Sequence, residues 1–203
     1  MIEGYIKYNC IWQKGEIPIQ NETFCQLESA RAVLYDLGLI GRYPDGIGFG
    51  NISVRSDNAL HFIISGSATG GLARLEPSDY AKVTSFHISE NTICCTGQTK
   101  ASAESLTHAA VYKSLPDAGA VVHIHCLWLW EKLLNNFPST QSEIQYGTPE
   151  MAEAVGLLAS EINGTQDKII VMGGHREGIL AFGSNLADAT SQIINIYNRY
   201  KND

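Results

Sequence analysis

The sequence predicts an α/β fold in which helices cover both faces of a mixed β-sheet. Segments typical of β-strands outnumber the helices that could connect parallel strands, and several of them follow one another across a short turn. The chain of 203 residues shows no internal repeat and no change of composition that would mark a linker. We therefore expect residues 1–203 to form one domain.

The first half of the chain predicts one long helix and two strand pairs. Residues 1–20 hold few clear signals and are expected to be irregular. The helix should begin at Asn21, which can cap it, and end at Gly38 or Gly41. The expected strands are 47–54, 60–64, 82–88 and 92–96, with a turn at 56–58, a glycine-containing loop at 65–75 and a short helix near Pro77.

The second half alternates more regularly between helices and strands. The expected helices are 103–114, 127–134, 148–162 and one from Asn185 onward, and the expected strands are 118–126, 169–172 and 178–182. Ser102 is expected to cap the first of these helices. Thr148, followed by a proline and a glutamate, is a strong start for the third.

The formal net charge of −7 argues against nucleic acid or an anionic membrane as the main partner, because both favour clustered Lys and Arg. No apolar run approaches the ~20 residues that cross a bilayer, and the first residues lack a signal-peptide pattern. The five cysteines form no C-x-x-C pair. These observations predict reduced thiols and a cytoplasmic location.

The segment Val121-Val122-His123-Ile124-His125 carries the main chemical signal. Side chains two positions apart on a strand point to the same face, so both imidazoles project together while Val122 and Ile124 enter the core. Neutral imidazole binds zinc and other divalent metals. For this pair alone, the alternative is a structural role in which backbone carbonyls satisfy both rings.

Two further residues extend this signal. His175 lies in a glycine-rich loop between two short expected strands, and such loops place functional groups at the end of a sheet. Glu104 opens a helix, where it either complements the helix dipole or transfers protons beside a metal. His108, one turn later, is expected to be structural. The sequence thus predicts a site formed by three histidines and one glutamate.

Three short segments could hold an anion. Residues 48–53 offer backbone donors and the Asn51 amide, Ser65 and Gly66 directly follow an expected strand, and Ser102 marks a helix start. Each of these features alone is common in turns. Together they suggest a pocket for a phosphate or a carboxylate.

These elements, in this order, resemble the class II aldolase/adducin family from about Glu22 to Tyr200. The motifs that carry the resemblance are Gly50-Asn51-Ile52-Ser53, Ser65-Gly66, Ser102-Ala103-Glu104 with His108, His123-Ile124-His125, and His175. The resemblance implies a three-layer α/β/α sandwich whose mixed central sheet is mostly antiparallel. It also implies a homotetramer with sites at subunit boundaries, where Tyr197 and Tyr200 either reach a neighbouring site or pack in their own helix.

Carried over by position, the resemblance implies that His123, His125 and His175 bind Zn²⁺ or another divalent metal and that Glu104 is the acid/base. It assigns a phosphate site to Asn51, Ser65, Gly66 and Ser102. The implied reaction is that of a zinc-dependent aldolase, a lyase of carbohydrate metabolism. It would cleave a small ketose or hydroxy-carbonyl compound, phosphorylated or not, through a metal-stabilised enediolate.

Two departures from the family pattern bear on the substrate. Ala103 stands where sugar-phosphate aldolases usually have a second serine, so one phosphate donor is missing. Glu143 replaces a tyrosine three residues before Tyr146-Gly147-Thr148, and it is either a different proton donor or, as we favour, a solvated loop charge.

Two alternatives to the aldolase remain open. One is a dehydratase acting on methylthioribulose phosphate, in which Glu143 would be the acid/base. The other is a non-catalytic, adducin-like binding module, which would not need the complete set of histidines and Glu104. The 4-epimerases of the family are less favoured, because they tend to carry aspartate in the place of Glu104.

Overall fold

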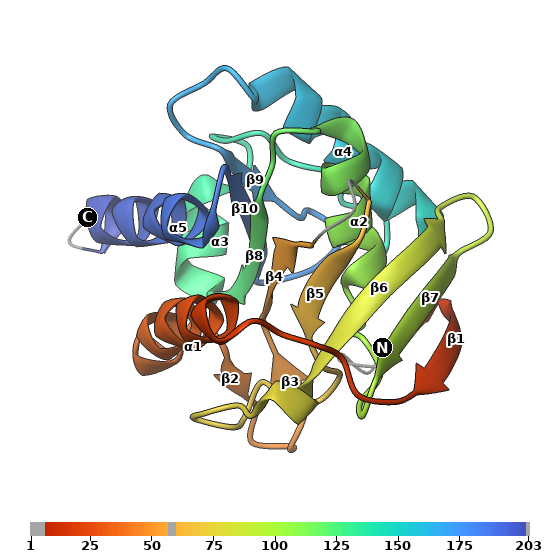
Figure 1. The fold of residues 1–203 in the computed structure, drawn as a ribbon. Helices are drawn as coiled ribbons and strands as arrows, with labels where there is room; N and C mark the ends of the chain where they lie inside the picture. The colour runs from red at the N-terminus through yellow and green to blue at the C-terminus, as the bar shows by residue number, and fades with distance from the viewer. Residues whose placement is uncertain (1–6, 57–59, 202–203) are drawn as a thin grey trace.

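The computed structural model of the protein describes residues 7–56 and 60–201 (Figure 1). The helices are α1 (Asn21–Asp36), α2 (Ser105–Ser114), α3 (Leu127–Leu133), α4 (Pro149–Ile162) and α5 (Leu186–Tyr200), with a short 3-10 helix at Pro77–Asp79. The strands are β1 (Asn9–Lys14), β2 (Gly41–Arg42), β3 (Gly48–Phe49), β4 (Asn51–Arg55), β5 (Phe62–Ser65), β6 (Tyr80–His87), β7 (Thr92–Gly97), β8 (Ala120–His125), β9 (Ile169–Val171) and β10 (Gly178–Gly183).

The central sheet has the strand order β1-β7-β6-β5-β4-β8-β10-β9. Neighbouring strands in this sheet pair antiparallel, apart from β1, which runs parallel to β7. The strands β2 and β3 form a separate hairpin. The prediction of a mixed, mostly antiparallel sheet is therefore confirmed.

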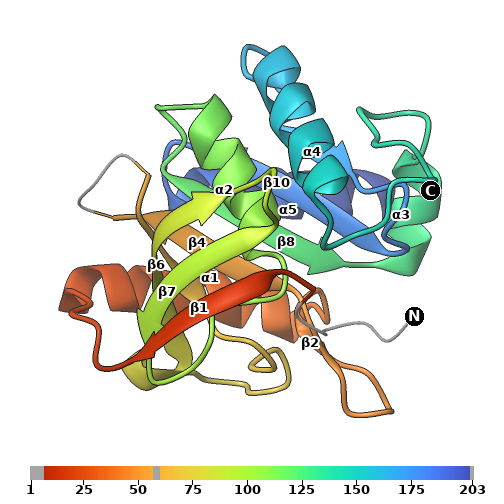
Figure 2. The same cartoon turned by 90° about the vertical axis from the view of Figure 1, so that its right-hand side faces the viewer.

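Two helical layers enclose this sheet. Helices α2 and α4 pack together on one face, where Leu106 and Met151 belong to the same buried cluster as Val121 and Leu180 of the sheet. Helices α1, α3 and α5 cover the other face. Figures 1 and 2 show the sheet between the two groups of helices, as expected for a three-layer α/β/α sandwich.

Within the expected irregular segment 1–20, the structure contains strand β1, so this prediction was wrong for Asn9–Lys14. Its sequence Asn-Cys-Ile-Trp-Gln-Lys lacks a clean alternation of apolar and polar residues, because an edge strand buries little of either face. Residues 1–6 lie outside the described part of the chain, as do 57–59, on which most of the turn expected at 56–58 falls.

Two expected boundaries were also wrong. The strand expected at 47–54 is interrupted at Gly50, whose φ of +74° is readily adopted only by glycine, and becomes β3 and β4. Helix α2 begins at Ser105 rather than at 103 and has Glu104 rather than Ser102 at its N-cap, because residues 103 and 104 form a turn after Ala101, which bridges to Gly66. The helix start at Thr148 is confirmed, since its hydroxyl accepts the Met151 N–H at 3.2 Å.

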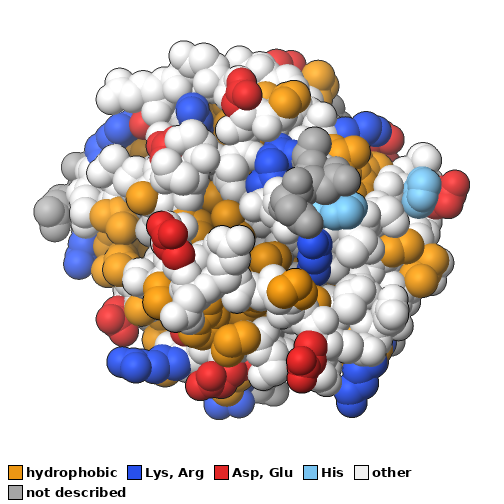
Figure 3. All heavy atoms as spheres, in the orientation of Figure 1, with side chains coloured by type: hydrophobic (Ala, Val, Ile, Leu, Met, Phe, Trp, Pro, Cys, Tyr) orange, Lys and Arg blue, Asp and Glu red, His pale blue; other side chains and the backbone are white. Residues whose placement is uncertain are grey.

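On the face seen in Figure 3, acidic and basic side chains are interspersed rather than gathered into a patch of one sign. No helix among the described residues has both the length and the apolar character needed to span a membrane.

Candidate metal centre

Strand pairing explains how the three histidines meet. His123 and His125 end β8, whose neighbours in the sheet are β4 and β10. Strand β10 begins opposite the end of β8, with Gly178 paired to His125, so the loop before β10 carries His175 to the same end of the sheet. Convergence of the histidines thus follows from the antiparallel register.

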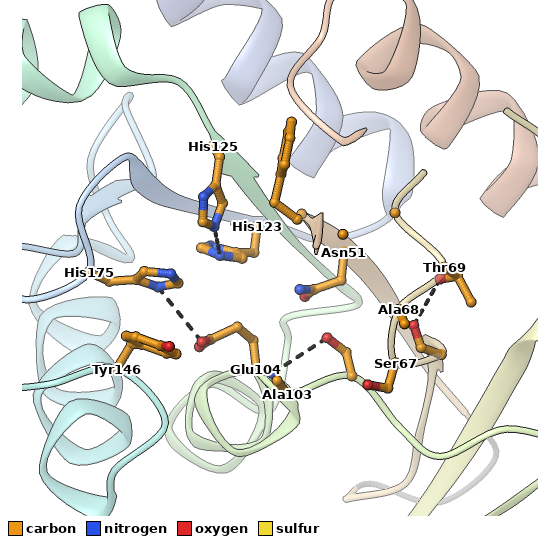
Figure 4. A pocket seen from close by; sticks show the side chains of 16 residues that line it. Asn51, Ser67, Ala68, Thr69, Ala103, Glu104, His123, His125, Tyr146 and His175 are labelled. Carbon is orange, nitrogen blue, oxygen red and sulfur yellow. Dashed lines mark hydrogen bonds and ion pairs between the residues drawn. The ribbon is translucent and has the colours of Figure 1, made fainter. Parts of the chain in front are cut away.

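The three imidazoles point into one small space (Figure 4). One ring nitrogen from each of His123, His125 and His175 lies within 4.8 Å of the others, and His123 Nε2 is 3.0 Å from His125 Nε2. All three side chains are buried. Burial, followed by the repulsion of the neighbouring rings, lowers the pKa of His123 and of His125 well below the usual value, so both imidazoles are neutral.

This donor set fits a divalent cation. Two neutral imidazoles facing each other can share only one proton, whereas a cation accepts a lone pair from each ring. Tetrahedral zinc with bonds of ~2.0–2.1 Å places its nitrogen ligands about 3.3 Å apart. The two Nε2 atoms of His123 and His125 are 3.0 Å apart, and no two of the three facing ring nitrogens are more than 4.8 Å apart. These distances bracket the value for zinc, so small side-chain movements suffice for ligation by all three histidines.

Glu104 lies beside the three rings. Its Oε1 is 3.7 Å from His175 Nδ1, its Oε2 accepts a hydrogen bond from Thr107 Oγ1 at 2.8 Å, and the residue is 4% exposed. The Thr107 hydrogen bond fixes the carboxylate, which leaves Oε1 toward the space between the histidines (Figure 4). The structure thus brings together the four residues that the sequence singled out.

Tyr146 and Lys7 adjoin the site. The Tyr146 ring stacks on His175 with centroids 4.4 Å apart and planes 21° apart, and Lys7 Nζ lies 3.4 Å from the Tyr146 centroid. The ammonium and the imidazole must lie on opposite faces of the phenol ring, because on one face they would overlap. Lys7 Nζ also donates to the Tyr146 carbonyl at 2.9 Å. Partial burial lowers the pKa of Lys7, and the attraction of the Glu104 carboxylate, which would raise this pKa, only partly offsets the effect.

A second set of contacts reaches His125 from outside the three rings. Tyr43, in the turn of the β2–β3 hairpin, places its hydroxyl 2.9 Å from His125 Nδ1 and donates to Glu177 Oε2 at 2.7 Å. The Phe49 ring packs 5.4 Å from the His125 ring and 4.5 Å from the Tyr43 ring. The hairpin therefore forms one wall of the site.

The expected anion pocket is present in part. Asn51, Gly66 and Ser102 line the same pocket as the histidines, together with the turn 67–70. Ser65 does not line it, because its hydroxyl accepts the Ile52 N–H at 3.2 Å inside the sheet. Asn51 Oδ1 is buried without a hydrogen-bond partner in the described part of the chain, and Figure 4 shows the side chain facing the pocket.

The turn at the far side of this pocket is held by a buried arginine. Arg31 of α1 is 1% exposed and donates to the carbonyls of Thr69 and Gly70 at 3.1 Å and of Ala73 at 3.3 Å. Its guanidinium thus fixes the loop from the side opposite the pocket.

The remaining candidates lie outside the pocket. His108 is fully buried, with Nδ1 2.7 Å from Ser53 Oγ, as expected of a structural residue. Glu143 is fully exposed and accepts a hydrogen bond from the neighbouring Ser142. Tyr197 packs on Trp128 and Tyr200 on Phe137 within this chain.

Sequence reasoning missed Lys7, Tyr43 and Glu177 as residues of the site. Tyr43 precedes Pro-Asp-Gly, a turn signal that could have predicted the hairpin, although not its contact with His125. Tyr146 was noted only as part of a motif, and no local signal connects it with His175.

Residues 42–201 match the family described as Class II Aldolase and Adducin N-terminal domain. No curated protein sequence matches the chain. Among solved structures, YgbL from Klebsiella pneumoniae, whose description offers aldolase, epimerase or decarboxylase as its activity, has a TM-score of 0.63 at 18% identity and covers 87% of this chain and 86% of its own.

Two other similar structures are sugar-phosphate aldolases by name. L-fuculose 1-phosphate aldolase has a TM-score of 0.59 at 18% identity, with 91% of this chain and 88% of that chain covered. A sugar-phosphate aldolase from Thermotoga maritima has a TM-score of 0.59 at 17% identity, with 87% and 91% covered. At these identities the likeness is one of fold.

Proposed function

Since the chain belongs to the class II aldolase/adducin family, we propose that it is a metal-dependent lyase of the aldolase type. The observation that carries the proposal is the set of three buried imidazoles with a buried carboxylate 3.7 Å from one of them. A non-catalytic module that binds no metal gains nothing from this arrangement, because burying ionisable groups costs stability unless they serve a ligand or a reaction.

We assign His123, His125 and His175 as the metal ligands and zinc as the favoured metal. Three neutral nitrogen donors suit zinc, which has no redox chemistry and can keep one position open for a substrate. Bound there, a divalent cation would act as a Lewis acid and withdraw charge from a substrate carbonyl and its adjacent hydroxyl during C–C cleavage.

Glu104 would transfer the proton. Its Oε1 faces the histidines while Oε2 is held by Thr107, so one carboxylate oxygen is free to exchange a proton with the substrate. In the cleavage direction Oε1 would accept the proton of the hydroxyl that becomes the aldehyde carbonyl as the C–C bond breaks, and would return it to the carbon that keeps the electron pair of that bond. Glu104 is 4% exposed, which limits the access of bulk water to the proton that its carboxylate carries.

The substrate would be a small ketose or hydroxy-carbonyl compound whose polar end lies against Asn51, Gly66 and Ser102. Asn51 Oδ1 lacks a partner within the described residues and could accept a substrate hydroxyl. Ala103 supplies no hydroxyl there, so free sugars and their phosphates are both candidates. Glu143 is exposed and lies outside the pocket of its own chain, which favours the aldolase over the dehydratase alternative.

Metal analysis of the purified protein tests this proposal first. We expect about one divalent metal per chain, lost in His123→Ala and retained in Glu104→Gln and in His87→Ala, a matched control on an exposed histidine. A wild-type protein that neither contains nor binds zinc would refute the proposal and favour a binding module.

Turnover is then measured with zinc-loaded protein against ketose phosphates and the corresponding free sugars, with aldehyde release as the signal. Glu104→Gln should lose about 10²–10⁴-fold in rate, the usual contribution of a positioned acid or base. Unchanged turnover in that variant would exclude Glu104 as the proton carrier. Loss of water from the substrate without aldehyde release would indicate a dehydratase instead.

We further propose a single-domain, cytoplasmic enzyme that assembles into a homotetramer. The five cysteines are free thiols, which suits a reducing compartment. Light scattering coupled to size-exclusion chromatography gives the mass of the assembly, and a monomer of 22.2 kDa would contradict the tetramer.

A further inference from the structure

The hydrogen bonds around Tyr43 determine where His125 carries its proton. A phenol has one proton to donate, and that of Tyr43 goes to Glu177 Oε2 at 2.7 Å. The Tyr43 oxygen can then only accept at its 2.9 Å contact with His125 Nδ1. His125 must therefore hold its proton on Nδ1 and present a lone pair at Nε2.

That lone pair points into the proposed metal position. His125 Nε2 is 3.0 Å from His123 Nε2 and faces the space that the three imidazoles share. In the opposite tautomer, His125 Nε2 would carry the proton and would offer no lone pair to a metal. The Tyr43 contact favours the tautomer that can bind a metal.

The backbone around Glu177 is shaped to make this contact. Glu177 has φ +75°, in the left-handed region that a non-glycine residue occupies only with backbone strain. The strained residue accepts the Cys126 N–H at 3.0 Å through its carbonyl, which ties it to the end of β8. Its neighbour Gly178 pairs with His125. The strain places a carboxylate beside the tyrosine that touches the same histidine.

The hairpin holds Tyr43 in place from the other side. The Tyr43 N–H donates to the Ile47 carbonyl at 2.8 Å, the Gly46 N–H donates back to Tyr43 at 2.9 Å, and the ring packs against Phe49. Two segments distant in sequence, one at 43–49 and one at 177, thus meet at the Tyr43 hydroxyl, which contacts His125 Nδ1.

We propose that Tyr43 and Glu177 are positioning residues of the metal centre, which fix His125 as the Nδ1–H tautomer and direct Nε2 to the metal. This inference rests on the proposed function in assigning His125 as a ligand. It extends that function to residues in the β2–β3 hairpin and in the loop after His175, and it predicts a property of the metal-free protein that can be measured separately.

The experiment is long-range ¹H–¹⁵N NMR of the histidine rings in metal-free protein, which identifies the protonated nitrogen of each ring. In the wild type His125 should be protonated at Nδ1. Tyr43→Phe should lose this fixed state and populate Nε2–H, whereas Tyr197→Phe, the same change on helix α5, should leave it intact. Glu177→Gln provides a second variant with an intact hairpin, and it should weaken the preference for Nδ1–H.

Co²⁺ titration of the same proteins gives the consequence for metal binding. Removing such an outer hydrogen-bond partner typically weakens metal affinity by about 10–100-fold, and we expect this loss in Tyr43→Phe and no loss in Tyr197→Phe. An Nε2–H tautomer in the wild type, or an unchanged tautomer and affinity in both Tyr43→Phe and Glu177→Gln, would overturn the inference. Failure of the wild type to bind Co²⁺ would instead refute the proposed function, because the tautomer measurement needs no metal.

Discussion

Gly174 is the position where one added methyl group should disturb the metal centre most directly without altering a ligand. It precedes His175 and packs against the segment 142–144. A Cβ at this position would fall well inside the contact distance of the Ile144 carbonyl oxygen, 2.6 Å from the Ile144 carbonyl carbon and 3.1 Å from the Ser142 oxygen. The obstacles are backbone atoms, so no side chain can rotate away to make room.

The size of the effect follows from this geometry. Contacts of a Cβ below 3.0 Å essentially never occur, so in Gly174→Ala the loop or the facing segment must move by about an ångström or more to clear the Ile144 carbonyl group. Overpacking of this kind costs ~1–3 kcal/mol of stability. Ligand distances in a metal site tolerate only ~0.2 Å, so the displaced His175 should lose affinity for zinc by about tenfold, or 1.4 kcal/mol.

Chemical denaturation of metal-free protein and zinc titration of folded protein measure the two effects separately. Gly164→Ala is the matched control, since a Cβ there meets nothing within 4 Å. It should change stability by less than ~1 kcal/mol and leave zinc affinity unchanged. If Gly174→Ala behaves like this control in both measurements, the packing argument and the placement of His175 are wrong.

Three further perturbations follow from contacts described above. Lys7→Met removes the ammonium from the Tyr146 ring and should shift the NMR signals of the His175 ring, on which Tyr146 stacks. The control Lys14→Met, on exposed β1, should leave these signals unchanged. Equal spectra for the two variants would exclude an effect of Lys7 on His175. Burial lowers the pKa of His108 to about 3 from 6.5, so only the unfolded state gains a proton between those values. Through His108, acidification should therefore lower the unfolding free energy of the metal-free protein by up to ~1.4 kcal/mol per pH unit. His108→Leu should reduce this dependence of stability on pH. An unchanged pH dependence would contradict the lowered pKa of His108. Arg31→Met should lower the unfolding free energy by about 3 kcal/mol, because three carbonyls of the pocket loop lose their donor. The control Arg199→Met, which breaks an exposed ion pair with Asp167, should cost less than ~1 kcal/mol in the same denaturation assay. Similar losses in the two variants would argue against the stabilisation of the loop by Arg31.

The sequence predicts well what depends on local alternation. His123 and His125 point to the same face because successive side chains of a strand point to opposite faces of the sheet, and this alternation does not depend on where the strand lies in the sheet. The caps of α4 and α5 are local as well, and both are present as side-chain hydrogen bonds. The layer arrangement could be inferred because the family resemblance was specific in its order of motifs.

What the sequence could not predict depends on register and on contacts between distant segments. His175 approaches His125 only because β10 pairs antiparallel with β8, and no residue in the loop specifies that register. Lys7 contacts Tyr146 across 139 positions, and Tyr43 contacts His125 across 82. The start of α2 was misplaced for a similar reason, since the bridge between Ala101 and Gly66 is a tertiary contact.

Strand β1 has a practical meaning for engineering the protein. It lies outside the matched residues 42–201, yet it covers the open side of β7 and begins two residues after Lys7. A shortened protein that starts at α1 would expose the backbone donors and acceptors of β7, inviting strand addition and aggregation. Affinity tags and fusion partners are better placed after α5, whose end lies on the opposite side of the molecule from β1 in Figure 1.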